Sequence, residues 1–61
     1  MKLIELWCVL SCVDVKVFRS HEHNTVYLLD GFTSDLDVSE YADCVVRFCF
    51  NHFDKFMICI E

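Results

Sequence analysis

Cysteine and histidine are the residue types best suited to chemistry in this sequence, with five and three copies in 61 residues. Cys8 and Cys12 are four residues apart and would share one face of a helix, while His21 and His23 would share one face of a strand. Zinc binds thiolate and imidazole ligands, but compact structural zinc sites usually hold them at other spacings than Cys-x3-Cys and His-x-His. The competing interpretation makes the cysteines small buried hydrophobic residues and the histidines polar loop residues. We therefore expect no metal or cofactor. If zinc were bound, these four residues would be the candidate ligands.

A catalytic thiol would need a base beside it. His21, His23 and His52 could serve, but no motif in the sequence pairs any of them with a cysteine. Nothing else meets the requirements of an active site, so we expect no enzymatic activity. The odd number of cysteines leaves one thiol over in any full disulfide pairing, which favours reduced thiols and a cytosolic protein.

The stretch WCVLSC, residues 7–12, could also belong to an export signal. Residues 9–12 are similar to a bacterial lipobox, and the apolar run behind Lys2 is similar to the start of a signal peptide. Glu5 interrupts that run, and Lys2 is the only base before it. We therefore expect this segment to stay in the folded domain.

The same stretch is most simply the second half of an amphipathic helix. Four apolar residues follow the i, i+3, i+4, i+7 spacing of a core-facing helix stripe: Leu3, Leu6, Trp7 and Leu10. Residues 12–19 then alternate valine with polar residues, which is typical of a half-buried strand. Three further strands are predicted, at residues 25–30, 44–50 and 55–61.

The connections between these elements contain turn-forming residues. Polar residues 20–24 predict a turn, Asp-Gly at Gly31 predicts the end of the second strand, and residues 51–54 predict a hairpin connection. Residues 35–43 predict a short acidic helical turn reaching about Ala42, or a loop. The chain is thus predicted to be a single domain, residues 1–61, of the α+β class, with an N-terminal helix packed on a small antiparallel sheet of about four strands.

The helix is predicted to cover one apolar face of this sheet, made by Val13, Val15, Val17, Val46, Phe48, Phe50, Phe56, Ile58 and Ile60. The other face is not cleanly polar, because Phe18, Cys49 and Met57 alternate with charged residues there. An apolar surplus on the open face of a small sheet usually marks an interface. We expect self-association through these three residues, as a homodimer, or a partner bound there.

Charge is unevenly distributed along the chain. Residues 20–46 contain no lysine or arginine and six acids, whereas the remainder has four acids and five bases; the net charge is −5. This balance argues against direct nucleic-acid binding and favours a basic protein partner. Five of these acids are the candidate partner-binding residues: Asp30, Asp35, Asp37, Glu40 and Asp43. The plainer interpretation is that they only keep the surface solvated.

Five stretches carry a family resemblance: MKLIEL at 1–6, DVKV at 14–17, LDG at 29–31, CVV at 44–46 and DKFMICIE at 54–61. In these stretches and in its layout the chain resembles small phage and prophage proteins of Gram-positive bacteria, which often run helix, strand pair, acidic connection, strand pair. Some acidic proteins of this kind are similar to inhibitors of host defence, including anti-CRISPR proteins that occupy the nucleic-acid groove of a CRISPR effector. The resemblance implies a location in the cytoplasm of an infected bacterial host and no membrane association.

Two functional hypotheses follow from the sequence. In the first, the protein inhibits a basic host nucleic-acid-handling protein, such as a CRISPR effector, by mimicking nucleic acid with its acidic segment. In the second, it is a self-associating structural or assembly module with no inhibitory role. A zinc-binding module is the third and minor alternative.

Overall fold

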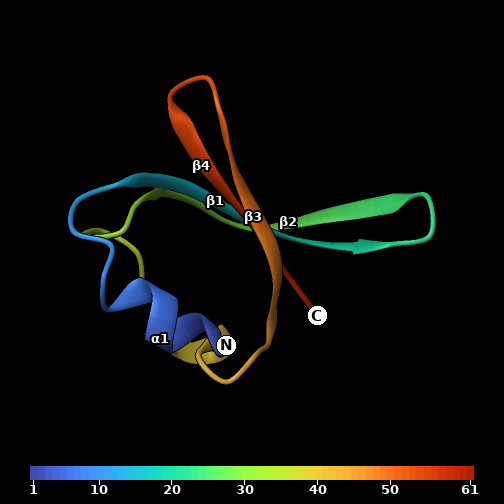
Figure 1. The fold of residues 1–61 in the computed structure, drawn as a ribbon, viewed down its shortest axis with the longest axis horizontal. Helices are drawn as coiled ribbons and strands as arrows, with labels where there is room; N and C mark the ends of the chain where they lie inside the picture. The colour runs from blue at the N-terminus through green and yellow to red at the C-terminus, as the bar shows by residue number, and fades with distance from the viewer.

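The chain folds as a four-stranded sheet with one layer of helix and loop on one of its faces, as shown in Figure 1. The structure is a computed structural model that describes residues 1–61. Its elements are α1 (Leu3–Trp7), β1 (Asp14–His21), β2 (Asn24–Phe32), the 3-10 helix η1 (Ser39–Tyr41), β3 (Val46–His52) and β4 (Lys55–Ile60). The predicted α+β class is therefore confirmed.

The sheet is mixed, with the strand order β2-β1-β4-β3. β1 and β2 form one antiparallel hairpin and β3 and β4 form another, but β1 and β4 run parallel from Val15↔Phe56 to Arg19↔Ile60. The prediction of a fully antiparallel sheet is wrong at this central pair. The long connection from β2 carries the chain to the far edge, so that β4 returns beside β1 in the same direction. The two hairpin turns consequently lie at opposite ends of the β1–β4 pair, one at the top and one at the right of Figure 1.

Both hairpins turn through two residues, Glu22–His23 and Phe53–Asp54. The first residue of each turn has a positive φ, 55° at Glu22 and 55° at Phe53. This backbone geometry suits the twist of a two-residue hairpin, but glycine or asparagine usually provides it.

Helix α1 is shorter than the predicted helix. Its first N–H groups, on Leu3 and Ile4, donate to the carbonyls of Cys44 and Ala42, and the Glu5 carboxylate accepts the Lys2 N–H at 2.7 Å. After Trp7 the N–H groups of Val9 and Leu10 bond three residues back instead of four. This tightening ends the helix, so WCVLSC is a helix end and a turn rather than half of a helix.

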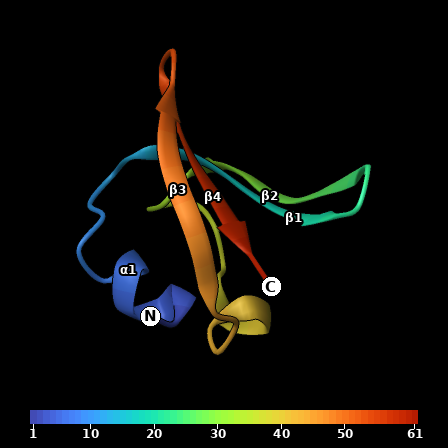
Figure 2. The ribbon, with the colours of Figure 1, turned by 45° about the vertical axis from the view of Figure 1, so that its right-hand side comes forward.

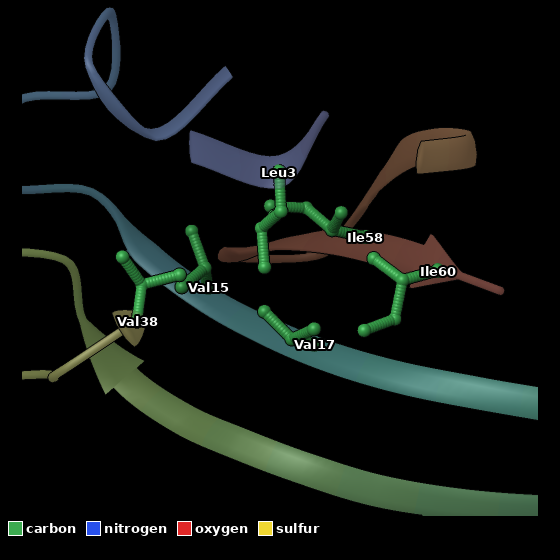
Figure 3. Close-up of a cluster of buried hydrophobic side chains, with 6 residues drawn as sticks. All are labelled: Leu3, Val15, Val17, Val38, Ile58 and Ile60. Carbon is green, nitrogen blue, oxygen red and sulfur yellow. The ribbon is translucent and has the colours of Figure 1, made fainter. Parts of the chain in front are cut away.

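The core lies between α1 and the central strands (Figure 3). Its buried side chains are Leu3, Val15, Val17, Val38, Ile58 and Ile60. The valine alternation of β1 and the isoleucine alternation of β4 are confirmed, because all four of these strand residues are buried. Val38 comes from the connection between β2 and β3 and was not predicted as a core residue.

That connection, residues 33–45, closes the covered side of the sheet. Buried Thr33 accepts the Val13 N–H at 3.1 Å through Oγ1, which also donates to the Leu10 carbonyl at 3.4 Å. Residues 35–43 were predicted as a short acidic helical turn or as a loop, and the helical turn to Ala42 is not confirmed. Only the three residues of η1 are helical, and Figure 2 shows them at the same end of the molecule as α1.

Gly31 lies inside β2 and does not end it, so the predicted Asp-Gly turn is wrong. It pairs with Val15, and its φ of 146° is in the region that favours glycine. The side chain of Leu36 packs 3.5 Å from the position where a Cβ would lie. Glycine here allows the connection to pack closely on the sheet.

Candidate functional site

Aromatic side chains gather on the open face of the sheet, opposite α1 and η1. Phe18 packs against Tyr27 at a ring distance of 6.2 Å and against Phe48 at 6.3 Å, and Phe48 stacks on Phe50 at 6.2 Å. We call these four residues the aromatic patch. Phe18 is buried, whereas Tyr27, Phe48 and Phe50 are 60%, 48% and 43% exposed. Three large aromatic side chains thus lie on a surface that no helix covers.

A β-bulge brings two of these residues to the open face. The register of β3 against β4 shifts between Val46 and Phe48, so that Phe48 pairs with Cys59 and Phe50 with Met57. The prediction that Phe48 and Phe50 belong to the covered face is wrong, because one extra residue in a strand moves the following side chains to the other side.

The three predicted self-association residues are divided by the same shift. Phe18 and Met57 lie on the open face. Met57 is half-buried, and its neighbours on the adjacent strands are Lys16 of β1 and Phe50 of β3. Cys49 pairs with Ile58 and therefore lies on the core side, exposed near the sheet edge. Cys49 cannot contribute to an interface on the open face.

Charged residues lie beside the aromatic patch on the open face. The Lys55 Nζ donates to Asp14 Oδ1 at 2.8 Å and to Asp30 Oδ1 at 2.5 Å, and the Lys16 Nζ lies 3.7 Å from Asp30 Oδ2. Lys16 also lies over the ring of Tyr27, 4.6 Å from its centre. These contacts join the ion pairs to the aromatic patch in one continuous surface.

The ion pairs shift the ionisation of both partners. The hydrogen bond from Lys55 is the main cause that lowers the pKa of Asp30, and the hydrogen bonds to Asp14 and then Asp30 raise the pKa of Lys55. Both groups therefore hold their charges more firmly than they would in free solution. Asp30, predicted as a partner-binding residue, is already held by two lysines.

The other four predicted partner-binding acids lie in the connection beside α1. Asp35, Asp37, Glu40 and Asp43 are all exposed. The Asp37 Oδ1 accepts the Ser39 N–H at 3.0 Å, which lowers the pKa of Asp37, and Asp43 lies 3.6 Å from the Lys2 Nζ. The structure thus separates these four acids from Asp30, which belongs to the open face.

The candidate zinc ligands are not gathered into a site. Cys8 and Cys12 follow α1, whereas His21 and His23 lie at the β1–β2 turn on the other side of Figure 1. No three histidine, cysteine or acidic side chains are grouped so as to hold a metal ion. The five cysteines are all free thiols.

No known protein-family model, curated protein or solved structure matches this chain. None of the helices has the length and apolar character needed to cross a membrane.

Proposed function

We propose that the protein is a non-catalytic interaction module that pairs with a second copy of itself through the open face of its sheet. The observation that carries this proposal is the aromatic patch, in which exposed Tyr27 and Phe48 flank buried Phe18 and exposed Phe50 stacks on Phe48. Aromatic residues on an uncovered sheet face are the usual centre of a protein interface.

Charge on the open face also favours a second copy as the partner. The two lysines and two acids there, Lys16, Lys55, Asp14 and Asp30, balance each other, although the chain as a whole carries −5. Two such faces can meet without net repulsion. The four acids of the connection, of which only Asp43 is paired with a lysine, lie beside α1, on the covered side.

The small core gives a physical reason for dimerisation. Six side chains form the only buried cluster under the helix layer. Domains below about 70–80 residues rarely gain enough stability from one core, and oligomerisation is a common remedy. Burial of the aromatic patch would give each chain a second apolar layer.

Sedimentation equilibrium of wild-type protein and two matched variants tests this proposal. Phe48→Ser removes an aromatic side chain from the patch, whereas Phe53→Ser removes one that is 92% exposed at the β3–β4 turn. We expect the wild type and Phe53→Ser to be dimers and Phe48→Ser to be a monomer. A wild-type monomer at several hundred micromolar, or equal dissociation of both variants, would show the proposal to be wrong.

A second candidate function is inhibition of a basic nucleic-acid-handling protein of a bacterial host, such as a CRISPR effector, by a phage-encoded nucleic-acid mimic. It is favoured by the exposed row of Asp35, Asp37, Glu40 and Asp43, in which Lys2 is the only paired base. A surface of this sign attracts a basic groove, in a salt-dependent manner.

Capture from host lysate at low and moderate salt tests this second function, in cells that express a CRISPR effector. Asp35→Lys/Asp37→Lys should lose a salt-sensitive basic partner. The control Glu22→Lys/Asp54→Lys makes the same change of charge at the two hairpin turns and should retain it. If both double variants capture the partner equally well, the acidic connection is not its binding site.

A further inference from the structure

Both arginines of the chain line one cleft at the end of β4. The cleft has a volume of about 390 Å³ and is lined by polar residues only: Arg19, Ser20, His21, Arg47 and Glu61. It lies at the opposite end of the sheet from the Lys55 ion pairs, because β4 runs from Lys55 to Ile60. It is therefore separate from the charged part of the open face.

The strand lengths and the bulge explain how this cleft forms. β4 stops at Ile60, opposite Arg19, while β1 continues to His21 without a β4 partner. On the other side of β4, the bulge leaves Arg47 outside the regular pairing, and its Nη1 donates across the gap to the Ser20 carbonyl at 3.4 Å. Two strands thus bring residues that are distant in sequence to one opening.

The arginines differ from the lysines in their partners. Every lysine is within ion-pair distance of an acidic side chain: Lys2, Lys16 and Lys55. Neither arginine lies within ion-pair distance of an acidic side chain. Arg19 donates through Nε to the Glu61 main-chain oxygen at 3.0 Å and through Nη2 to the Cys44 Sγ at 3.8 Å. Because a guanidinium has five N–H donors, most of the donors of Arg19 and Arg47 remain available.

We propose that this cleft binds a phosphate group, either as the free ion or as a phosphate monoester. Two guanidinium groups can each offer paired N–H donors to phosphate oxygens, which is the geometry that makes arginine the preferred phosphate ligand. Ser20 and His21 line the same cleft, and hydroxyl and imidazole groups can also donate hydrogen bonds to phosphate oxygens. Its volume falls at the lower end of the range of about 300–1,000 Å³ for small-molecule sites.

The protein carries a net charge of −5, which disfavours the binding of an anion anywhere on its surface. The field of the whole molecule repels anions, so binding has to come from the local donors in the cleft. Glu61 is the one acid in the lining, and its carboxylate opposes an anionic ligand. Arg47→Gln should therefore weaken phosphate binding, and Glu61→Gln should strengthen it.

Nitrogen-15 NMR titration of the folded protein with inorganic phosphate provides the test, with sodium chloride at matched ionic strength as the reference. We expect saturable shifts of the Arg19 and Arg47 Nε–H groups and of the amides that line the cleft. Arg47→Gln should reduce the affinity at least about tenfold, the size expected for loss of a charged donor pair. Lys2→Gln removes one positive charge elsewhere and should leave the affinity unchanged. Arg47 is exposed on an edge strand and makes one hydrogen bond, to the Ser20 carbonyl at 3.4 Å, so we expect its replacement to leave the fold intact.

A parallel titration with phosphoserine identifies the source of the phosphate. Tighter binding of phosphoserine than of inorganic phosphate supports a monoester ligand, and equal or weaker binding supports the free ion. Shifts that chloride reproduces, or equal affinities of Arg47→Gln and Lys2→Gln, would overturn the proposal. In that case the two arginines only hold the ends of β1, β3 and β4 together.

Discussion

Replacement of Ile58 by alanine tests whether the parallel β1–β4 pair holds the core. Ile58 is 0% exposed, pairs with Val17 and belongs to the cluster in Figure 3. Alanine removes three carbon atoms, each contributing about 0.8 kcal/mol when buried, and the remaining cavity adds to the loss. The free energy of unfolding should fall by about 3–4 kcal/mol.

This loss is large for so small a domain. At about 0.05–0.15 kcal/mol per residue, a chain of this length has roughly 3–9 kcal/mol of stability. Urea unfolding can be followed through Trp7, the single tryptophan, which is half-buried against the core. Ile58→Val should lose only about 1 kcal/mol, which keeps the series measurable if the alanine variant is partly unfolded.

Val26→Ala is the control, because Val26 is an exposed apolar residue on the edge strand β2. It should change the free energy of unfolding by less than about 0.5 kcal/mol. If Ile58→Ala and Val26→Ala lose equal amounts, the β1–β4 pair does not hold the core, and the packing described above is wrong.

Three further predictions follow from the turns, the ion pairs and the thiols. Phe53→Gly should raise the free energy of unfolding by up to about 1 kcal/mol, because a phenylalanine with φ of 55° is strained; an unchanged or lower melting temperature contradicts this. The lowered pKa of Asp30 stabilises the fold above its ordinary pKa of 3.8, and this contribution disappears as the pH falls through the lower folded value. Urea unfolding of Lys55→Met should therefore show a weaker loss of stability on acidification than the wild type, and equal pH profiles would exclude this role of Lys55. Ellman's reagent should modify Cys59 only on unfolding, because it is buried, and should react first with Cys8, Cys12 and Cys49; rapid reaction of all five thiols in native protein would contradict the packing of β4.

Local sequence patterns predicted the element types well and their pairing poorly. Alternation placed Val15, Val17, Ile58 and Ile60 in the core, because period two identifies which face of a strand is buried. It does not identify the neighbouring strand. The position of β4 beside β1 depends on the path of residues 33–45, which carry no regular pattern.

The open face was only partly predictable for a related reason. Phe18 and Met57 were assigned to it correctly, but Tyr27 was not singled out and Phe48 and Phe50 were assigned to the core. The bulge beside Arg47 reverses the alternation of β3, and nothing in its sequence, such as a glycine, marks the shift.

The arginine cleft could not be predicted, because its signal is not local. Arg19 and Arg47 belong to different hairpins and meet only because β4 ends between β1 and β3. In the sequence they are two isolated bases, whereas the long acidic stretch is obvious. The structure shows that the more conspicuous acidic residues do not all share one surface.

The parallel pairing of β1 with β4 also has consequences for how the chain folds. Each hairpin closes over two residues and can form in about 1–10 µs, whereas Val15 and Phe56 must meet across most of the chain. We therefore expect this pairing to form late, and until it forms the inner edges of β1 and β4 are unpaired and can accept a strand from another molecule. Two chains that exchange their C-terminal hairpins would form the same β1–β4 pairs between molecules. Formation of the β1–β4 pair is therefore the step at which protein refolding at high concentration can produce domain-swapped dimers.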